Sequence, residues 1–399
     1  MFDFIAWRFL LFAAAFGLLM YLQFYLGHRQ WNRLKGEQAG EIDVNYVRTE
    51  NYMAQSFRMK VKDWLQLPVS QDREFGPVIM KGHERIRTLA GMDLADHATC
   101  DDILVLEQNF SCGQGCSLTR EVLVHGNSNI GSESRLQSMA ADGDLMLGEK
   151  VSVARWVDSN GELTLSAGCH VGSRVTSLTR IRLGLGVEIP SASAPQIVTA
   201  EWDSKLPGED PASRDLLEIA FPDGSEAVEE SLAAAKLNAK RFVQLGGDTW
   251  LYKGEVRPPV PVRLRRKLAV AGDCYFPEGT VLEFDVKAGG SIFLGPSCVI
   301  RGNLVADGHI FLGPGCRFSG LVHAEKTLLL SRGTRGFRVD GMVAAYAGEE
   351  LSLETDVALK GKIASGARAV VIDAAAAQAW RDQRRIQDDG SAVDQVHTS

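Results

Sequence analysis

An eighteen-residue repeat in the second half of the chain restricts the fold more than any other feature of the sequence. Four similar segments begin at Phe276, Leu294, Leu312 and Leu330, and each start is displaced by 18 from the one before (294 − 276, 312 − 294, 330 − 312). A short, fixed period is typical of a solenoid, in which each repeat buries its apolar face only against its neighbours. The repeat therefore predicts a stacked rod.

A finer period of six residues divides each repeat. Counting from Leu294, the first and fifth residues of every six are apolar or small, and Gly, Pro, Asn, Asp and charged residues lie between them. Two inward residues per six, with three sixes per coil, fit a triangular β-solenoid, an all-β fold of short strands and tight turns. The core columns that we predict for the second half include Leu294, Cys298, Leu312, Cys316, Leu330 and Thr334.

The first half of the chain carries the same repeat. Its segments begin at Cys112, Ile130, Leu147, Leu165 and Leu183, and the intervals between these starts are 18, 17, 18 and 18. We expect on the order of ten coils, hence a rod of roughly 50 Å at the ~4.8 Å strand spacing. A β-sandwich is the alternative, but sandwiches do not hold one register over so many units. The unpaired backbone of the end coils is a template for another chain.

The N-terminal segment predicts a membrane anchor. Residues 9–26 contain no charged side chain, and as a helix they span ~27 Å, close to the ~30 Å hydrocarbon core of a bilayer. A cleaved signal peptide is the alternative, although no basic stretch precedes the apolar run. The residues that we expect to contact the lipid bilayer are Trp7, Phe9, Leu18, Leu19, Tyr25 and Leu26.

The flanking charges predict which side of the membrane holds the rod. The cations Arg29, Arg33 and Lys35 follow the apolar run, whereas only Arg8 and the amino terminus precede it, offset by Asp3. The positive-inside rule then places the solenoid in the cytoplasm. Seven cysteines, an odd number, agree with a reducing compartment. A rod in the periplasm remains the alternative.

Changes of pattern divide the chain into six parts. A helical pattern ends at Pro68, and helical runs recur at residues 225–240 and 374–386. We expect the last of these helices to cap or cover the final coil. The predicted parts are a transmembrane anchor (1–27), a juxtamembrane helical stalk (28–73), a first solenoid half (74–187), an insertion with a helix (188–260), a second solenoid half (261–373), and a C-terminal helix with a disordered tail (374–399).

The cysteines and histidines do not form a recognisable metal-binding or catalytic motif. Cys112 and Cys116 have C-x3-C spacing, but no second pair lies at zinc-binding distance. Left-handed β-helix acyltransferases also run on eighteen-residue coils and use a histidine as general base. Here the fifth column holds bulky residues, and His125, His170, His309 and His323 show no evident carboxylate partner. We therefore expect no catalytic residue, cofactor or metal, and a formal charge of −7 does not indicate nucleic-acid binding.

Residues 291–316 resemble a bactofilin, a member of a family of bacterial polymer-forming cytoskeletal proteins. The coil pattern of that family is matched at residues 294–304 and 312–322; the similarity is good over 268–372 and looser over 101–187. The resemblance implies a right-handed triangular β-helix that polymerises end to end without nucleotide. It also implies a role in cell shape, or in placing envelope-building enzymes at the membrane.

These observations together predict a function. We expect a non-enzymatic, bactofilin-like scaffold, anchored in the bacterial inner membrane by a single span, that self-associates through solenoid ends or faces and positions envelope-building proteins. Two alternatives stay open. One is a hexapeptide acyltransferase that modifies an envelope sugar or lipid. The other is a rigid spacer subunit of an envelope or polysaccharide-export complex.

Overall fold

The computed structural model describes residues 21, 50–72, 76–199, 216–219, 221, 226–246 and 248–382. The predicted anchor residues Trp7, Phe9, Leu18, Leu19, Tyr25 and Leu26 lie outside this part of the chain. Within the described residues, no helix combines the length and the apolar character that a bilayer crossing requires. The chain separates into two units, Met1–Tyr52 and Met53–Ser399, and the second contains the entire solenoid.

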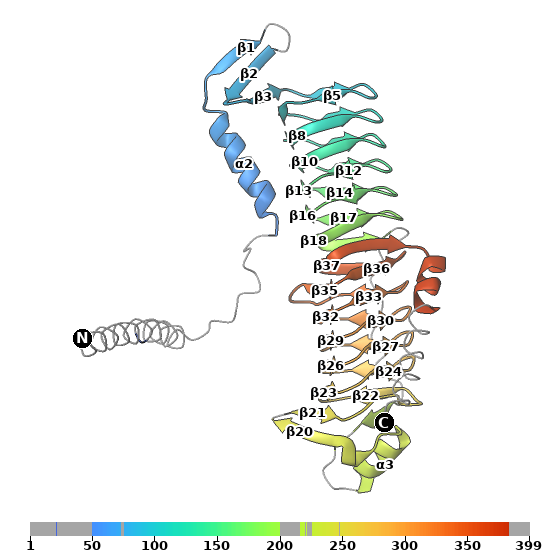
Figure 1. The fold of residues 1–399 in the computed structure, drawn as a ribbon. Coiled ribbons are helices and arrows are strands. Elements are labelled where there is room, and N and C mark those ends of the chain that lie inside the picture. The colour runs from blue at the N-terminus through green and yellow to red at the C-terminus, as the bar shows by residue number, and fades with distance from the viewer. Residues whose placement is uncertain are drawn as a thin grey trace, which may run out of the picture. The chain divides into compact units, whose positions relative to one another are not determined.

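The first half of the solenoid has three sides, each a ladder of parallel strands (Figure 1). Side A contains β3 (Glu84–Leu89), β6 (Ile103–Leu106), β8 (Ser117–Val124), β10 (Arg135–Ala141), β13 (Trp156–Ser159) and β16 (Arg174–Ser177). Side B contains β4 (Met92–Leu94), β7 (Phe110–Cys112), β9 (Ser128–Ile130), β11 (Leu145–Leu147), β14 (Glu162–Leu165) and β17 (Arg180–Leu183). Side C contains β5 (Thr99–Cys100), the starts of β8 and β10, β12 (Ser152–Val153) and β15 (His170–Val171).

The second half repeats this arrangement on sides that we call A′, B′ and C′. Side C′ contains β19 (Leu217–Ile219), β22 (Val262–Leu264), β25 (Val281–Leu282), β28 (Val299–Ile300), β31 (Arg317–Phe318) and β34 (Arg335–Gly336). Side A′ contains β21 (Thr249–Tyr252), β23 (Lys267–Val270), β26 (Val286–Ala288), β29 (Leu304–Ala306), β32 (Leu321–Ala324) and β35 (Val343–Ala347). Side B′ contains β24 (Cys274–Phe276), β27 (Ile292–Leu294), β30 (Ile310–Leu312), β33 (Thr327–Leu330) and β36 (Glu350–Glu354).

The predicted solenoid is confirmed, and it is longer than expected. It has about 15 turns, which at the strand spacing of ~4.8 Å make a rod of roughly 70 Å. One continuous apolar core runs through both halves. The predicted column residues Leu294, Cys298, Leu312, Cys316, Leu330 and Thr334 are all buried in it.

The two halves meet at their last coils and run in opposite directions. β18 (Glu188–Thr199) and β37 (Ala358–Ile372) each turn through all three sides, and they pair with one another in antiparallel register. Side A continues into side A′, side B into C′, and side C into B′. The second half therefore begins at the far end of the rod and returns to the middle (Figure 1). An approximate two-fold axis through this junction relates the halves.

The junction defines the role of two segments. Residues 188–199, which we assigned to the insertion, form the closing coil of the first half. The helix at residues 374–382 does not cap the end of the final coil, because β18 already occupies that edge. It covers the flank of side B′, including the final coil, which is the second of the two expected arrangements: Ala377 is buried, Arg381 pairs with Glu354 of β36, and the Arg381 guanidinium lies 5.3 Å from the centroid of the Phe311 ring.

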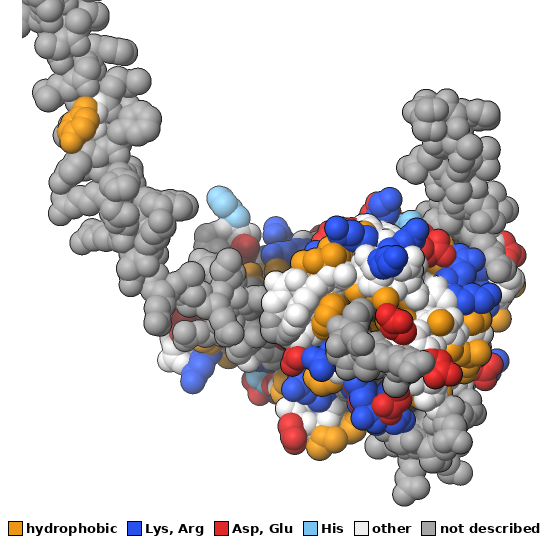
Figure 2. All heavy atoms as spheres, turned by 90° about the horizontal axis from the view of Figure 1, so that it is seen from below, with side chains coloured by type: hydrophobic (Ala, Val, Ile, Leu, Met, Phe, Trp, Pro, Cys, Tyr) orange, Lys and Arg blue, Asp and Glu red, His pale blue; other side chains and the backbone are white. Residues whose placement is uncertain are grey.

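Both outer ends of the solenoid carry additional elements. At the start of the second half, α3 (Glu226–Ala234), η1 (Ala239–Arg241) and β20 (Phe242–Gly246) enclose Phe221 and Trp250, whose ring centroids are 5.6 Å apart. Figure 2 views this end, and on its described part apolar side chains alternate with charges of both signs. At the start of the first half, β1 (Val69–Asp72) and β2 (Gly76–Lys81) form an antiparallel meander with β3.

Gly361 gives a direct test of the junction. Its φ of 148° is one that side chains rarely adopt, and an added Cβ would lie 2.0 Å from the Val343 carbonyl oxygen. We expect Gly361→Val to lower the free energy of unfolding by about 3 kcal/mol or more, because the strain adds to a steric clash at the closing strand. Urea denaturation of residues 50–399 measures the change. The control is Lys362→Val, at the half-exposed next position; equal midpoints for the two variants would contradict this prediction.

Candidate functional site

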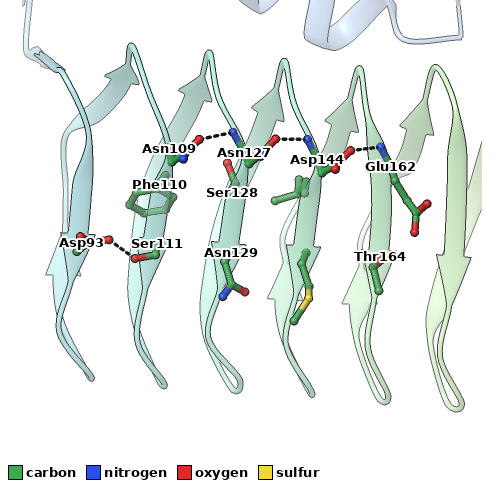
Figure 3. A pocket seen from close by; sticks show the side chains of 12 residues that line it. Asp93, Asn109, Phe110, Ser111, Asn127, Ser128, Asn129, Asp144, Glu162 and Thr164 are labelled. Atoms are coloured by element: carbon green, nitrogen blue, oxygen red, sulfur yellow. Dashed lines mark hydrogen bonds between the residues drawn. The ribbon is translucent and has the colours of Figure 1, made fainter.

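A shallow hollow lies on the outer face of side B (Figure 3). Its volume is about 410 Å³. The outward side chains of successive strands form its floor, since Asp93, Ser111, Asn129, Met146 and Thr164 occupy directly paired positions. The remaining lining residues are Asn109, Phe110, Asn127, Ser128, Asp144, Leu145 and Glu162.

A ladder of side-chain oxygens borders this hollow at the corner between sides A and B. Asn109 Oδ1 accepts a hydrogen bond from the Asn127 amide at 2.9 Å, and Asn127 Oδ1 accepts one from the Asp144 amide at 2.8 Å. Asp144 Oδ1 then accepts from the Glu162 amide at 2.7 Å (Figure 3). Each side chain thus completes the turn of the next coil. The hollow offers polar groups repeated every ~4.8 Å, an arrangement suited to binding an extended ligand and not to positioning one reacting atom.

The second distinctive surface is the outer face of side A, which α2 (Tyr52–Trp64) covers. Phe57, Val61 and Trp64 are buried there, and the rings of Phe57 and Trp156 meet edge to face with centroids 5.9 Å apart. The spacing of these apolar residues, i, i+4 and i+7, gives one apolar stripe on the helix. The stripe packs on outward-facing apolar residues of the sheet, including Ile103, Val105, Leu123 and Ala140.

Arg58 fixes α2 to the solenoid through three polar contacts. Its guanidinium donates to Asp142 Oδ1 at 3.0 Å, to Asp158 Oδ2 at 2.6 Å and to the Ala141 carbonyl at 3.1 Å. The Asp158 side chain is only 2% exposed, and burial raises its pKa, although hydrogen bonds from Thr176 and Arg58 act in the opposite direction. Arg58 therefore compensates a buried carboxylate that would be costly alone.

Three of the four histidines have carboxylate partners, contrary to the expectation from the sequence. His323 Nε2 lies 3.3 Å from Glu325 Oε1, two residues further along the chain, and the other two partners lie on the next coil. His125 Nδ1 lies 2.7 Å from Asp142 Oδ2, and His170 Nδ1 lies 3.8 Å from Glu188 Oε2. Each of these two partners is one repeat further along the chain, so a search for acid–base pairs at the repeat length would have found both. Asp142 also accepts from Arg58 and from Asn160, so its carboxylate is part of the α2 contact.

The seven cysteines serve the interior. All are buried and unpaired, and several donate their S–H to a carbonyl of the preceding coil, as Cys169 does to Gly148 at 3.0 Å and Cys298 to Pro277 at 3.3 Å. Burial raises the pKa of Cys112 and of Cys169 to about 11, so both are thiols at neutral pH and poor nucleophiles. Within the described part of the chain, no group of three or more His, Cys, Asp or Glu residues is placed to hold a metal ion.

The structure does not gather the predicted site residues into one place. The core-column residues are distributed along the interior at successive coils and present no group to solvent, and the anchor residues lie outside the described chain. The surfaces that it does reveal, the polar hollow and the α2 contact, depend on residues one coil apart. They belong to a β-solenoid protein with few helices. Comparisons with protein-family models, with curated proteins and with solved structures find no match for the chain.

Removing the Arg58 cation tests the α2 contact. We expect Arg58→Met to lower the free energy of unfolding by about 3 kcal/mol, because Asp158 is left buried without its cation. Hydrogen exchange of the backbone amides of α2 should rise in parallel. The control is Lys62→Met on the exposed face of the same helix, where we expect a change within about 0.5 kcal/mol.

The same variant has a defined pH dependence. A carboxyl group whose folded pKa is raised stabilises the fold fully below its unfolded pKa and loses that contribution as the pH rises through the folded value. Arg58 is one of the groups that lower the Asp158 pKa, so its removal raises that pKa further. The destabilisation by Arg58→Met should therefore be larger at pH 7 than at pH 4. An effect independent of pH would contradict the role given to Asp158.

Proposed function

We propose that the protein is a non-enzymatic, bactofilin-like scaffold that is anchored in the bacterial inner membrane and positions envelope-building proteins along a rigid rod. The observation that carries the proposal is the junction. Within one molecule, β18 and β37 join two solenoid halves across all three sides by antiparallel pairing. Coils of this sequence are thus suited to end-to-end association, which is the property that the resemblance to bactofilins implies.

The free edge for association between molecules is the first coil of the first half on sides B and C, since β2 already pairs with β3 on side A. Among the described strands, β4 pairs only with β7, and β5 only with β8. Leu94 and Ala98 in this coil are half-exposed, whereas the equivalent Cys112 and Cys116 in the next coil are buried. An edge with unpaired backbone groups and a partly open core favours pairing with another strand. The other end of the rod is enclosed by α3 and the β20–β21 hairpin.

The attachment of α2 supports the anchored arrangement. α2 lies in the segment that follows the expected membrane span (1–27), and it is fixed along side A by apolar packing and by Arg58. A tether attached to side A leaves sides B and C accessible to partners, together with β4 and β5 of the first coil. The cytoplasmic placement of the rod rests on the flanking charges and on the odd number of cysteines.

One observation favours the acyltransferase alternative. His125 and Asp142, 2.7 Å apart, have the geometry of a general base with its orienting carboxylate. The same Asp142 carboxylate accepts from Arg58 and Asn160, which gives it a structural use. A rigid spacer in an export complex is the third candidate, and it shares the rod geometry with the scaffold.

Electron microscopy of negatively stained residues 50–399 tests the proposal. Without added nucleotide, we expect rods joined end to end. Met92→Lys should abolish the joints, because an inward-pointing charge on an edge strand opposes pairing, while Met146→Lys on the outer face of side B should not. Discrete trimers that bind acyl-CoA would establish the acyltransferase instead. Single rods that assemble only with another protein would favour the spacer.

A further inference from the structure

Large apolar side chains gather on one longitudinal edge of the rod. This apolar edge is the corner between sides A and B in the first half and between sides C′ and A′ in the second. The corner is continuous across the junction, because Ala194 pairs with Gly361 and Ile197 pairs with Leu359. The exposed apolar residues on it are Leu178, Phe284, Phe337, Val339, Met342 and, at the tip of the β20–β21 hairpin, Leu245.

The apolar edge continues over successive coils along much of the second half. From Leu178 the corner passes to Lys360, then to the loop at 337–342, and coil by coil to Phe284 and Arg266. Asp248, beside the hairpin tip, bonds to Arg266 at 2.8 Å and so places Leu245 at the end of this line. At ~4.8 Å per coil, the line is roughly 40 Å long.

The most prominent part of the edge is an insertion in the repeat. Strands before the corner keep the eighteen-residue interval, as in Arg317↔Arg335, whereas strands after it have an interval of 23, as in Leu321↔Ala344. The five additional residues (23 − 18) therefore lie in the loop at 337–342. Val339 is 74% exposed and Met342 57% exposed, so the insertion adds apolar surface that the core does not use.

Contacts of Lys360 fix the conformation of the loop at 337–342. Lys360 Nζ donates to the carbonyls of Arg338 at 3.3 Å and Val339 at 3.1 Å, and it lies 5.4 Å from the centroid of the Phe337 ring. The apolar tips therefore project from a fixed base. The local charge is positive: the loop carries Arg338 and Asp340, the adjacent β37 carries Lys360 and Lys362, and the Arg335 cation is paired with Asp356 at 2.6 Å.

The shape of the edge indicates a flat partner. A corner of a three-sided rod is convex, and Gly302 and Gly320 separate Phe284 from the 337–342 loop. A convex line of isolated apolar tips contacts a plane along its length, whereas a peptide or helix needs a groove to bury its side chains. Apolar side chains flanked by cations are the combination that inserts into the headgroup region of an anionic membrane.

We propose that the apolar edge, through Phe337, Val339 and Met342 with the cations Arg338, Lys360 and Lys362, binds the surface of an anionic lipid bilayer. The rod then lies along the membrane instead of standing away from it. This inference rests on the proposed membrane anchor, which brings the edge to the bilayer. It leaves side B, with its polar hollow, available to other ligands.

A depth measurement on the full chain tests the edge. Met342→Cys is labelled with a polarity-sensitive fluorophore, which the seven buried native thiols leave as the accessible site. The protein is reconstituted into vesicles of phosphatidylethanolamine and phosphatidylglycerol that contain a lipid with a headgroup-level nitroxide quencher. Met146→Cys, at a similarly exposed position on side B, is the matched control.

We expect the fluorophore at Met342 to be blue-shifted and quenched, and the one at Met146 to remain in water. Arg338→Gln should lower the membrane-contact equilibrium about fivefold, the effect of one cation near an anionic surface. Equal and weak quenching at both sites would overturn the inference. A blue shift at Met342 without quenching would also overturn it, because it would show a protein contact.

Flotation of the unlabelled full chain with the vesicles separates this inference from the proposed anchor. A chain that does not float contradicts the anchor itself, and with it the basis of the edge contact. A chain that floats but shows no quenching at Met342 contradicts the edge contact alone.

Discussion

The structure depends on one constraint: every coil must place its inward side chains directly over those of the coil before it. Parallel pairing at the eighteen-residue interval, as in Leu294↔Leu312 and Leu312↔Leu330, meets this constraint on each side. The same interval generates the polar ladder at Asn109 and Asn127, the His170–Glu188 pair and the buried thiol column. Many side-chain hydrogen bonds consequently join one residue to its counterpart on the next coil, as Asp285 accepts from Asn303.

At the junction, the pairing of strands changes from parallel to antiparallel. Two rods that meet at their last coils traverse the axis in opposite directions, so their closing strands pair antiparallel. β18 and β37 do so on all three sides. The arrangement gives one long core from two halves, and it uses the edge at which a single-half rod would associate with another chain. The proposed association between molecules would use the first coil, where β4 and β5 each pair on one edge only among the described strands.

The sequence predicted the repeat and its core columns because burial at a fixed period leaves a direct trace in the order of residues. It predicted α2 and α3 from helical spacing. It could not predict the reversal of the second half, since the pairing of β18 with β37 joins segments far apart in the chain and has no period. The helix at 374–382 lies on side B′ for the same reason. The sequence did not predict the ion pairs of Arg58, because this residue lies beside Asp142 and Asp158 only after the coils have formed.

The two solenoid halves join through their antiparallel closing coils, β18 and β37. Disulfide trapping tests this most directly, with cysteines introduced in pairs and oxidised under mild conditions. Ser193 and Lys362 are direct partners across the junction, so Ser193→Cys with Lys362→Cys should form an intramolecular disulfide. Ser193→Cys with Lys287→Cys, several coils away on side A′, should not. Cross-linking of the second pair, or its absence in the first, would contradict the junction.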